Sequence, residues 1–540
     1  MVKARFRIGS DGSNARQIAA ATPNMGRIGV SAASQQDPFT PWGPLGSASS
    51  FEGAGYGRRL KNFNPSRSHI NIAIEFAGRT LVKRARYLVE NAALAGNAVD
   101  VWAAWVVGEG IRPRVPSSVS DEKRKAVRKL WKRWIREADA DNQTNYYGMQ
   151  ERVAREVYIA GEVFIRRRIR RPGDMRSVPL QLQLLPSEML DLSYNINLDN
   201  GNYIRMGIEF DKIGRRIAYH FWTKHPDDFI TQFPPKLRTR VPAEEVAHIF
   251  DARQGQQIRG LSKFARAIVK LFSLDSYNDA ELERKRVAAL YAGFVTKTGE
   301  GSALDNPDPN GDQSEAPELQ PGAMVVLENG EDVKFSSPAD VGGSYEPFQY
   351  RTALEVAAAL SIPYAYLTGD MTRGNFSNVR TDIINFRRKF GQHQSNVMIP
   401  QFCERVWEWW LDVAELADML AVDDDMRDES HMPPRMDWVD PRADVDAEAK
   451  AVRNGFKTRD QVVASQGGDL DEFDEARARE NASADKHGLV YDSDPRRTSA
   501  VGQSNAVAPG FGYADPDDEP GDTSPEPVEP KGKGTSSDEA

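Results

Sequence analysis

The sequence contains a single cysteine, Cys403, among 540 residues. One thiol can form neither a disulfide framework nor a cysteine-based zinc site within the chain, so we expect a reducing compartment. Long apolar runs are also missing. The least polar long segment, Ala92–Val107, is too short to span a bilayer and contains Asn97 and Asp100, which indicates a buried helix. The first 25 residues hold no apolar stretch, so we expect no secretory signal.

Motifs of the common enzyme classes are absent too. The chain has no G-x-x-x-x-G-K-[ST] phosphate loop, no G-x-S-x-G elbow and no H-E-x-x-H helix. Its seven histidines lack the spacing of metal ligands, and we interpret His248, in an apolar run, as a core or interface residue. Cys403 lies beside Phe402 and is interpreted as a buried small apolar residue. We therefore expect no catalytic residue, no cofactor and no metal.

The net charge of −8 excludes a polycation that coats nucleic acid by bulk charge. Nine acidic residues and two lysines from Asp515 to Ala540 supply −7 of it, so the rest of the chain is nearly neutral. Residues 486–540 form an acidic, Pro-rich tail that buries little surface and is predicted to be disordered. Residues 1–60, rich in Gly, Ser, Ala and Asn, are predicted to form a flexible arm.

Between these ends, the spacing of apolar residues predicts an α+β body. Helices are expected in residues 62–107, after Ser120 and over Met149–Tyr158. Alternation of apolar and polar residues predicts five strands: Val163–Ile169, Leu180–Leu185, Tyr203–Phe210, Arg216–Phe221 and His248–Phe250.

The second half of the body reads as long helices separated by loops. A helix is expected over Leu261–Val295, and a hairpin over residues 324–336 with its turn at Asn329-Gly330. A second helix covers Tyr345–Leu360. After the polar loop Thr368–Phe376, Ser377 is the expected N-cap of a helix that breaks near Pro400 and ends near Leu420.

Basic residues form local clusters, each of which can contact phosphates or form a solvated or intersubunit face. The clusters are Lys83-Arg84-Ala85-Arg86, Lys123-Arg124-Lys125, Arg166-Arg167-Arg168 with Arg170-Arg171, and Arg387-Arg388-Lys389. Trp407, Trp409 and Trp410 recur at helical spacing and are interpreted as core.

Several runs, taken in order, resemble the lambda-type family of tailed-phage portal (head-tail connector) proteins. They are Arg84-Ala85-Arg86 with Asn91, Val106-Val107-Gly108-Glu109-Gly110-Ile111, Gly161-Glu162-Val163-Phe164, the stretch from Val241 to Ser262 with Arg253-Gln254-Gly255-Gln256-Gln257-Ile258-Arg259-Gly260, Ala280-Glu281-Leu282, Leu367-Thr368-Gly369-Asp370, and Trp438-Val439-Asp440-Pro441. No single run is specific; their order over about residues 62–480 carries the resemblance.

The resemblance implies a ring, of twelve copies in that family, at one vertex of the capsid. Double-stranded DNA passes through the ring without sequence recognition, pumped in by the terminase large subunit and later ejected. Further implied partners are the major capsid or scaffold protein during assembly and a head-completion or adaptor protein afterwards. The implied location is the virion, and the host cytoplasm during assembly, with no membrane contact and no catalysis by the chain itself.

The resemblance also divides the chain into parts. They are the wing (61–260), first stem helix (261–296), clip (297–343), second stem helix (344–366), tunnel loop (367–376), wing helix (377–425) and helical crown (426–485). The implied DNA-facing residues of the tunnel loop are Thr368, Gly369, Asp370, Met371, Thr372, Arg373, Gly374, Asn375 and Phe376. Channel or intersubunit roles are implied for Arg380, Arg387, Arg388 and Lys389, and a clip turn for Asn329 and Gly330.

Two other classes of function stay open from the residues alone. A nuclease needs clustered acids for metal ions, and Asp423-Asp424-Asp425 is the available candidate, although it also reads as a solvated loop. An oligomeric structural protein of a phage tail or baseplate needs no catalytic group. A tail protein, however, has no need of a long helix, a hairpin module and a second helix in succession.

Overall fold

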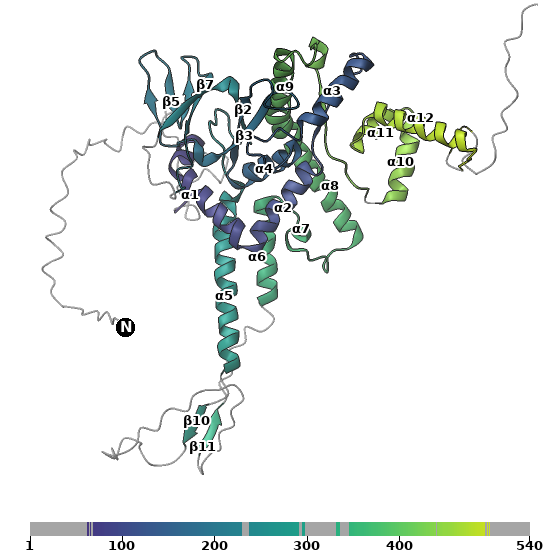
Figure 1. Ribbon diagram of the computed structural model, residues 1–540. Helices are drawn as coiled ribbons and strands as arrows, with labels where there is room; N and C mark the ends of the chain where they lie inside the picture. Colours follow the sequence, from purple (N-terminus) through teal and green to yellow (C-terminus); the bar gives the residue numbers. More distant parts are fainter. Residues whose placement is uncertain are drawn as a thin grey trace, which may run out of the picture. The chain divides into compact units, whose positions relative to one another are not determined.

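The computed structural model describes residues 62–63, 65, 68–228, 237–290, 294–297, 331–334, 345–438, 440–491, 494 and 496 (Figure 1). The chain divides into two compact units, Met1–Ser68 and His69–Ala540, and everything described below lies in the second. The predicted arm (1–60), most of the predicted tail (486–540) and the predicted Asn329-Gly330 turn lie outside the described residues.

Four helices form the first part of this unit. They are α1 (Ile70–Asn91), α2 (Ala93–Val107), α3 (Asp121–Trp134) and α4 (Tyr146–Ile159). Seven side chains of α2 are buried, among them Val99 and Trp102, which confirms the interpretation of this apolar segment as a buried helix. Ser120 stands at the N-cap position of α3 as expected, but its side chain makes no capping hydrogen bond.

The strands form two principal antiparallel sheets. In the first, β2 (Glu162–Ile169) lies between β3 (Leu180–Pro186) and β9 (Val246–Phe250). The second is a meander of β4 (Ile196–Asn197), β5 (Tyr203–Arg205), β6 (Ile208–Phe210), β7 (Arg216–Trp222) and β8 (Arg238–Pro242). The single strand expected over Tyr203–Phe210 is wrong: Met206 (φ 50°) and Gly207 (φ 80°) adopt left-handed conformations that turn the chain between β5 and β6.

Within the core, aromatic side chains from segments distant in sequence pack together. Trp131 and Trp134 of α3 pack on Tyr146, Trp407 and Trp410, with ring centroids 4.8–5.4 Å apart. Trp407, Trp409, Trp410 and Cys403 are all buried, as predicted. A second cluster lies around Phe164 of β2 and Phe221 of β7 and joins the two sheets.

Two long helices follow the sheets. After a short 3₁₀ turn (Lys263–Arg266), α5 spans Ile268–Leu290, and α6 (Tyr345–Leu360) packs beside it (Figure 1). The expected start of the first helix at Leu261 is wrong, because the Ser262 hydroxyl caps the 3₁₀ turn. Its expected end at residue 296 is also too late: Phe294–Lys297 is strand β10, which pairs with β11 (Glu331–Lys334).

The chain then forms α7 (Tyr364–Thr368), α8 (Phe376–His393), a π-helix (Gln394–Cys403) and α9 (Glu404–Leu416). Instead of the expected break near Pro400, the wider π turns accommodate the proline and the helix continues. Strand β12 (Ser430–Met432) pairs with β1 (Arg112–Arg114). The last helices, α10 (Pro441–Arg453), α11 (Arg459–Ser465) and α12 (Leu470–His487), contain no buried residue. None of the described helices has the length and hydropathy needed to cross a membrane.

Candidate functional site

The loop between α7 and α8 is shorter than the predicted tunnel loop. Thr368 belongs to α7 and Phe376 is the first residue of α8, so the loop itself comprises residues 369–375. Gly369 (φ 75°) ends α7 in a left-handed conformation, with its N–H donating to the Ala365 carbonyl over 2.9 Å. The loop therefore starts at a fixed glycine cap.

Side-chain hydrogen bonds give the loop local structure. The Asp370 carboxylate accepts from the Thr372 hydroxyl (2.5 Å) and the Thr372 N–H (2.9 Å), and from the Tyr364 hydroxyl (3.2 Å). The two bonds from Thr372 are the main cause that lowers the pKa of Asp370. The Met371 side chain in this turn is about half exposed. The loop is thus a folded, ionised turn exposed to solvent.

Arg373 ties the loop to the start of α6. Its guanidinium forms an ion pair with Glu346 and lies over the Tyr350 ring, 4.2 Å from the centroid. The implied DNA-facing role of Arg373 stays a prediction, since these contacts are those of a single chain without DNA. Both partners come from α6, so this arginine links loop position to the long helical pair.

The helix after the loop is capped by Asn375. Its side-chain oxygen accepts from the Asn378 N–H over 2.8 Å, so the prediction of Ser377 as N-cap is wrong. Gly374, the residue before Asn375, is closely packed. A Cβ on Gly374 would come within 2.9 Å of a Val379 methyl group. The cap therefore lies two residues before the expected one, with the Asn375 amide oxygen in the capping role.

The basic residues of α8 separate into two groups. Arg380 lies 3.9 Å from Asp444 of α10, and Arg387 donates to the Asp437 carbonyl over 2.6 Å. Arg388 and Lys389 are exposed. Arg380 and Arg387 thus contact α10 and the segment that leads into it, whereas Arg388 and Lys389 form no ion pair with any residue that the structure describes.

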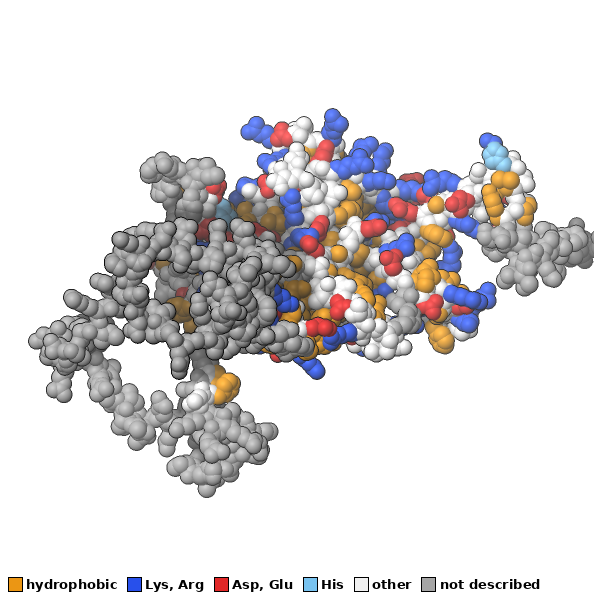
Figure 2. Space-filling view, turned by 90° about the horizontal axis from the view of Figure 1, so that it is seen from below, with side chains coloured by type: hydrophobic (Ala, Val, Ile, Leu, Met, Phe, Trp, Pro, Cys, Tyr) orange, Lys and Arg blue, Asp and Glu red, His pale blue; other side chains and the backbone are white. Residues whose placement is uncertain are grey.

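Single arginines of two other basic clusters pair with acids of the body. Arg86 of α1 binds Glu156 (2.7 Å) and Glu188 (2.5 Å) between helices, and Arg166 of β2 lies 3.6 Å from Glu245. On the face shown in Figure 2, Lys and Arg side chains lie interspersed with Asp, Glu and hydrophobic side chains. On that face, charges of the two signs alternate, so no strong field of one sign is created there.

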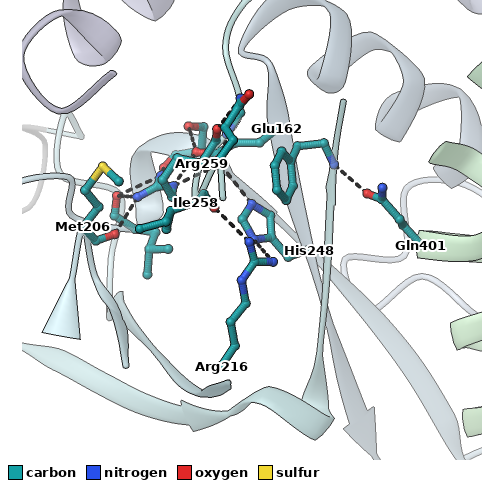
Figure 3. Close-up of polar contacts among 12 residues, drawn as sticks. Glu162, Met206, Arg216, His248, Ile258, Arg259 and Gln401 are labelled. Atoms are coloured by element: carbon teal, nitrogen blue, oxygen red, sulfur yellow. Dashed lines mark hydrogen bonds and ion pairs between the residues drawn. The ribbon is translucent and has the colours of Figure 1, made fainter. Parts of the chain in front are cut away.

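A buried ion-pair network fixes the chain where it enters α5 (Figure 3). Glu162, the first residue of β2, is 2% exposed and accepts from Arg259 Nε at 2.8 and 3.0 Å, and from the Gly260 N–H at 2.8 Å. His248 Nε2 lies 3.0 Å from the same carboxylate. Arg259 also donates to the Met206 carbonyl over 2.8 Å.

Burial and charge act in opposite directions in this network. Burial alone would raise the pKa of Glu162, but Arg259 and His248 hold it well below its usual range. Burial lowers the pKa of His248 to about 4, against the influence of Glu162. The network is therefore a carboxylate–guanidinium pair with a neutral histidine, which confirms the interpretation of His248 as a core residue.

Two glycines allow the network to form. A Cβ on Gly260 would lie 2.2 Å from the Gly161 carbonyl oxygen, and one on Gly161 (φ 93°) would lie 2.3 Å from the Leu261 backbone. The Gly161-Glu162 and Arg259-Gly260 dipeptides therefore cross in direct contact. In the sequence the two dipeptides belong to separate motifs, and nothing there reveals that they pair. The signal of a buried charge is Glu162 itself, which stands between a glycine and the apolar residues Val163-Phe164.

Acidic residues form no metal centre in the described part of the chain, where no group of three or more His, Cys, Asp or Glu is placed to bind an ion. Asp423 instead pairs with Lys123 at 2.5 Å, and Asp424 and Asp425 are exposed in a 3₁₀ turn. The triad that a nuclease would need is thus a solvated turn with one ion pair.

Comparison with known proteins identifies the family. The model of the family "Phage portal protein, lambda family" matches residues 56–394, well over half of the chain. The chain belongs to the lambda family of phage portal proteins. It is 25% identical over 374 residues to the "Probable portal protein" of Halomonas phage phiHAP-1, covering 65% of this chain and 69% of that protein.

Other portal proteins align over more of the chain. The identity is 22% to the portal protein of Escherichia phage N15 and 21% to portal protein B of Escherichia phage lambda, each covering 81% of this chain and 90% of the relative. A chain from the neck of a native GTA particle is similar in structure, with a TM-score of 0.43 and 16% identity over 73% of this chain and 93% of that one. The chain is thus a structural protein of the virion, at the portal vertex through which the genome is packaged and ejected.

Proposed function

We propose that the chain assembles into a ring, of twelve subunits by analogy with its family, whose channel carries double-stranded DNA. The succession α5, β10–β11 and α6 carries this proposal. Two helices pack side by side and a pair of strands lies between them in sequence, which is the arrangement of a stem and clip. The packing of α5 on α6 includes Tyr277 and Tyr345, stacked 5.8 Å apart, and Lys270–Glu355 at 2.8 Å.

The parts of the protomer then take the following roles. The helices and sheets of residues 61–260 form the wing, α5 and α6 the stem, and residues 297–343 the clip. The α8–α9 helix crosses the wing behind the loop 369–375, and α10 to α12 form the crown. The Glu162–Arg259 network supports this division, since it holds the last wing residues rigidly against β2 immediately before the stem begins.

Within the channel, the loop 369–375 is the element nearest to DNA. It is exposed, ends in glycine on the α7 side and is connected to the stem through Arg373 and Glu346. We assign to Arg373 a positioning role, with Met371 and Thr372 as the residues presented to the duplex. Weak contacts repeated around a ring would centre DNA without gripping it.

The partners proposed for the ring follow from these roles. The terminase large subunit would dock on the clip, the major capsid or scaffold protein on the wing during assembly, and a head-completion protein after packaging. DNA passage would be non-specific, and ATP hydrolysis would belong to the terminase, because the sequence carries no phosphate loop. We propose no catalytic activity for the chain itself.

Negative-stain imaging of the purified protein tests the proposal. A ring with a central hole wide enough for a duplex is expected. A monomer under all conditions, or a solid disc or fibre of the kind that a tail or baseplate component forms, would overturn it. Metal-dependent cleavage of plasmid DNA that disappears in Asp423→Asn would favour the nuclease alternative instead.

A further inference from the structure

Three basic side chains of α3 pair with acidic side chains at the start of α12. Arg124 lies 2.7 Å from Asp471, and Lys125 lies 2.9 Å from Glu475. Arg128 reaches both Asp469 (3.2 Å) and Asp471 (3.1 Å). These contacts place the N-terminal half of α12 along α3.

One further pair lies beside this contact. Arg114 of β1 binds Asp460 of α11 in a two-pronged arrangement, at 2.6 and 2.9 Å. All of these pairs join the body to α11, α12 or the Asp469 cap of α12. Every cation lies on the body and every anion on the C-terminal helices, so the attachment is strongly complementary in charge.

Hydrophobic packing contributes little to this attachment. None of the residues of α10, α11 or α12 is buried, and Phe456 and Phe473 are 81% and 51% exposed. Between α3 and the start of α12 lie a cavity of about 310 Å³, lined mainly by the charged residues of these pairs, and another of about 560 Å³. Exposed ion pairs are individually weak and are screened by salt, so an attachment of this kind is reversible.

The surface under α12 suits a polyanion. The inner face of α3 packs Val127, Trp131 and Trp134 into the core, which holds the helix rigidly in place. On its other faces, Lys125, Lys129 and Lys132 are exposed and recur at three- and four-residue spacing, over about 10 Å at 1.5 Å per residue. In the described part of the chain, no ion pair engages Lys129 or Lys132, so the row of cations extends beyond the area that α12 covers.

We propose that the basic face of α3 is a binding surface for the phosphate backbone of double-stranded DNA, occupied in the free protein by the acidic side chains of α12. This inference rests on the proposed function, which brings a high density of phosphate to the ring. DNA displaces α12 by exchanging its phosphates for the carboxylates of Asp471 and Glu475. In the free ring α12 of the crown is paired with α3, and when DNA binds to α3, α12 is released.

The test compares two variants with the same change of charge in the assembled full-length protein. Asp471→Asn with Glu475→Gln removes the anions that pair with α3. Asp446→Asn with Glu480→Gln neutralises two acids of α10 and α12 for which the described part of the chain holds no ion pair with α3; Glu480 pairs with Arg477 of its own helix. Binding of a fluorescent 30-base-pair duplex is measured over a series of salt concentrations.

We expect the first variant to bind DNA about fivefold or more tightly at low salt than the second. The logarithm of its binding constant should fall more steeply with the logarithm of the salt concentration. The slope should change by about 0.9 for each cation that contacts a phosphate. Adding Lys125→Gln and Arg128→Gln should return the affinity to that of the control. Equal affinity of the two variants, or a gain that survives the loss of Lys125 and Arg128, would overturn the inference.

Hydrogen exchange of the wild-type protein is a second test of this inference. Imaging of rings then distinguishes a failure of this inference from a failure of the proposed function. Adding duplex DNA should speed hydrogen exchange of α12 amides relative to those of α4, and unchanged exchange at saturating DNA counts against displacement. Rings in every variant with no difference in DNA binding would defeat only this inference. A chain that forms no ring would defeat the proposed function, whatever its affinity for DNA.

Discussion

Arg259 Nε donates to Glu162 Oε1 over 2.8 Å, in a setting that leaves the arginine 0% and the glutamate 2% exposed. The two residues are 97 positions apart in sequence. They join strand β2 to the segment that leads into α5. The orientation of the long helices therefore depends on a charge pair that water does not reach.

Glu162→Gln should be among the most destabilising single changes in the chain. It leaves the Arg259 charge buried without its counter-ion, which costs about 3–5 kcal/mol of the free energy of unfolding. The midpoint of chemical denaturation reports this loss. Glu408→Gln, which breaks the exposed Arg405–Glu408 pair, is the control and should cost no more than about 1 kcal/mol. Similar midpoints for the two variants would show that the buried pair is not needed.

His393 should make the protein sensitive to acid. Burial lowers the pKa of His393 to about 4, below the ordinary value of 6.5. Between pH 6.5 and 4 the unfolded chain therefore binds a proton that the folded chain does not, and stability falls as the pH is lowered. The slope is about 1.4 kcal/mol per pH unit for one such group.

His393→Phe keeps a ring against Trp102. In denaturation series between pH 6.5 and 4, it should reduce the slope of stability against pH by up to about 1.4 kcal/mol per pH unit. His487→Phe, at the exposed end of α12, should leave the slope unchanged. An identical slope in wild type and His393→Phe would mean that the buried ring takes up its proton without unfolding.

Two substitutions test which residue caps α8, Asn375 or Ser377. Asn375→Ala removes the acceptor for the Asn378 N–H and should cost about 1 kcal/mol of local helix stability. Hydrogen exchange at the first turn of α8 should accelerate accordingly. Ser377→Ala, two positions along, should have little effect. Faster exchange in Ser377→Ala than in Asn375→Ala would restore the serine as the cap.

Shortening the loop 369–375 to a Gly-Ser link should leave the ring intact and impair packaging. The loop contributes no buried core residue, so assembly does not depend on it. Particles assembled with this variant should retain less DNA than wild type, measured as DNA per particle. Full heads of normal stability would mean that another element faces the duplex.

The role of Arg373 is separable from that of the loop as a whole. If Arg373 positions the loop through Glu346, then Glu346→Gln and Arg373→Ala should impair DNA retention to a similar, mild and salt-dependent degree. Direct phosphate contact predicts the opposite pattern, in which Glu346→Gln has no effect or improves retention by freeing the cation. Packaging assays at two salt concentrations discriminate between these outcomes.

The sequence by itself determined the α+β class, the buried segment Ala92–Val107, the helix Tyr345–Leu360 and the burial of the tryptophans around Trp407. These features depend on local periodicity, because one face of a helix or strand is either apolar or not. The order of short motifs was enough to predict the portal family, which the family comparison confirms.

Tertiary structure decided the features that depend on which distant segments meet. A 3₁₀ turn capped by the Ser262 hydroxyl precedes α5, and before that turn the chain crosses at Gly161 and Gly260 in close contact. No periodicity in residues 261–267 reveals either feature. The Glu162–Arg259 pair and the contact of α3 with α12 join charges far apart in sequence. Coulomb attraction acts through space rather than along the chain, so only the folded arrangement shows which of many possible partners each charge has.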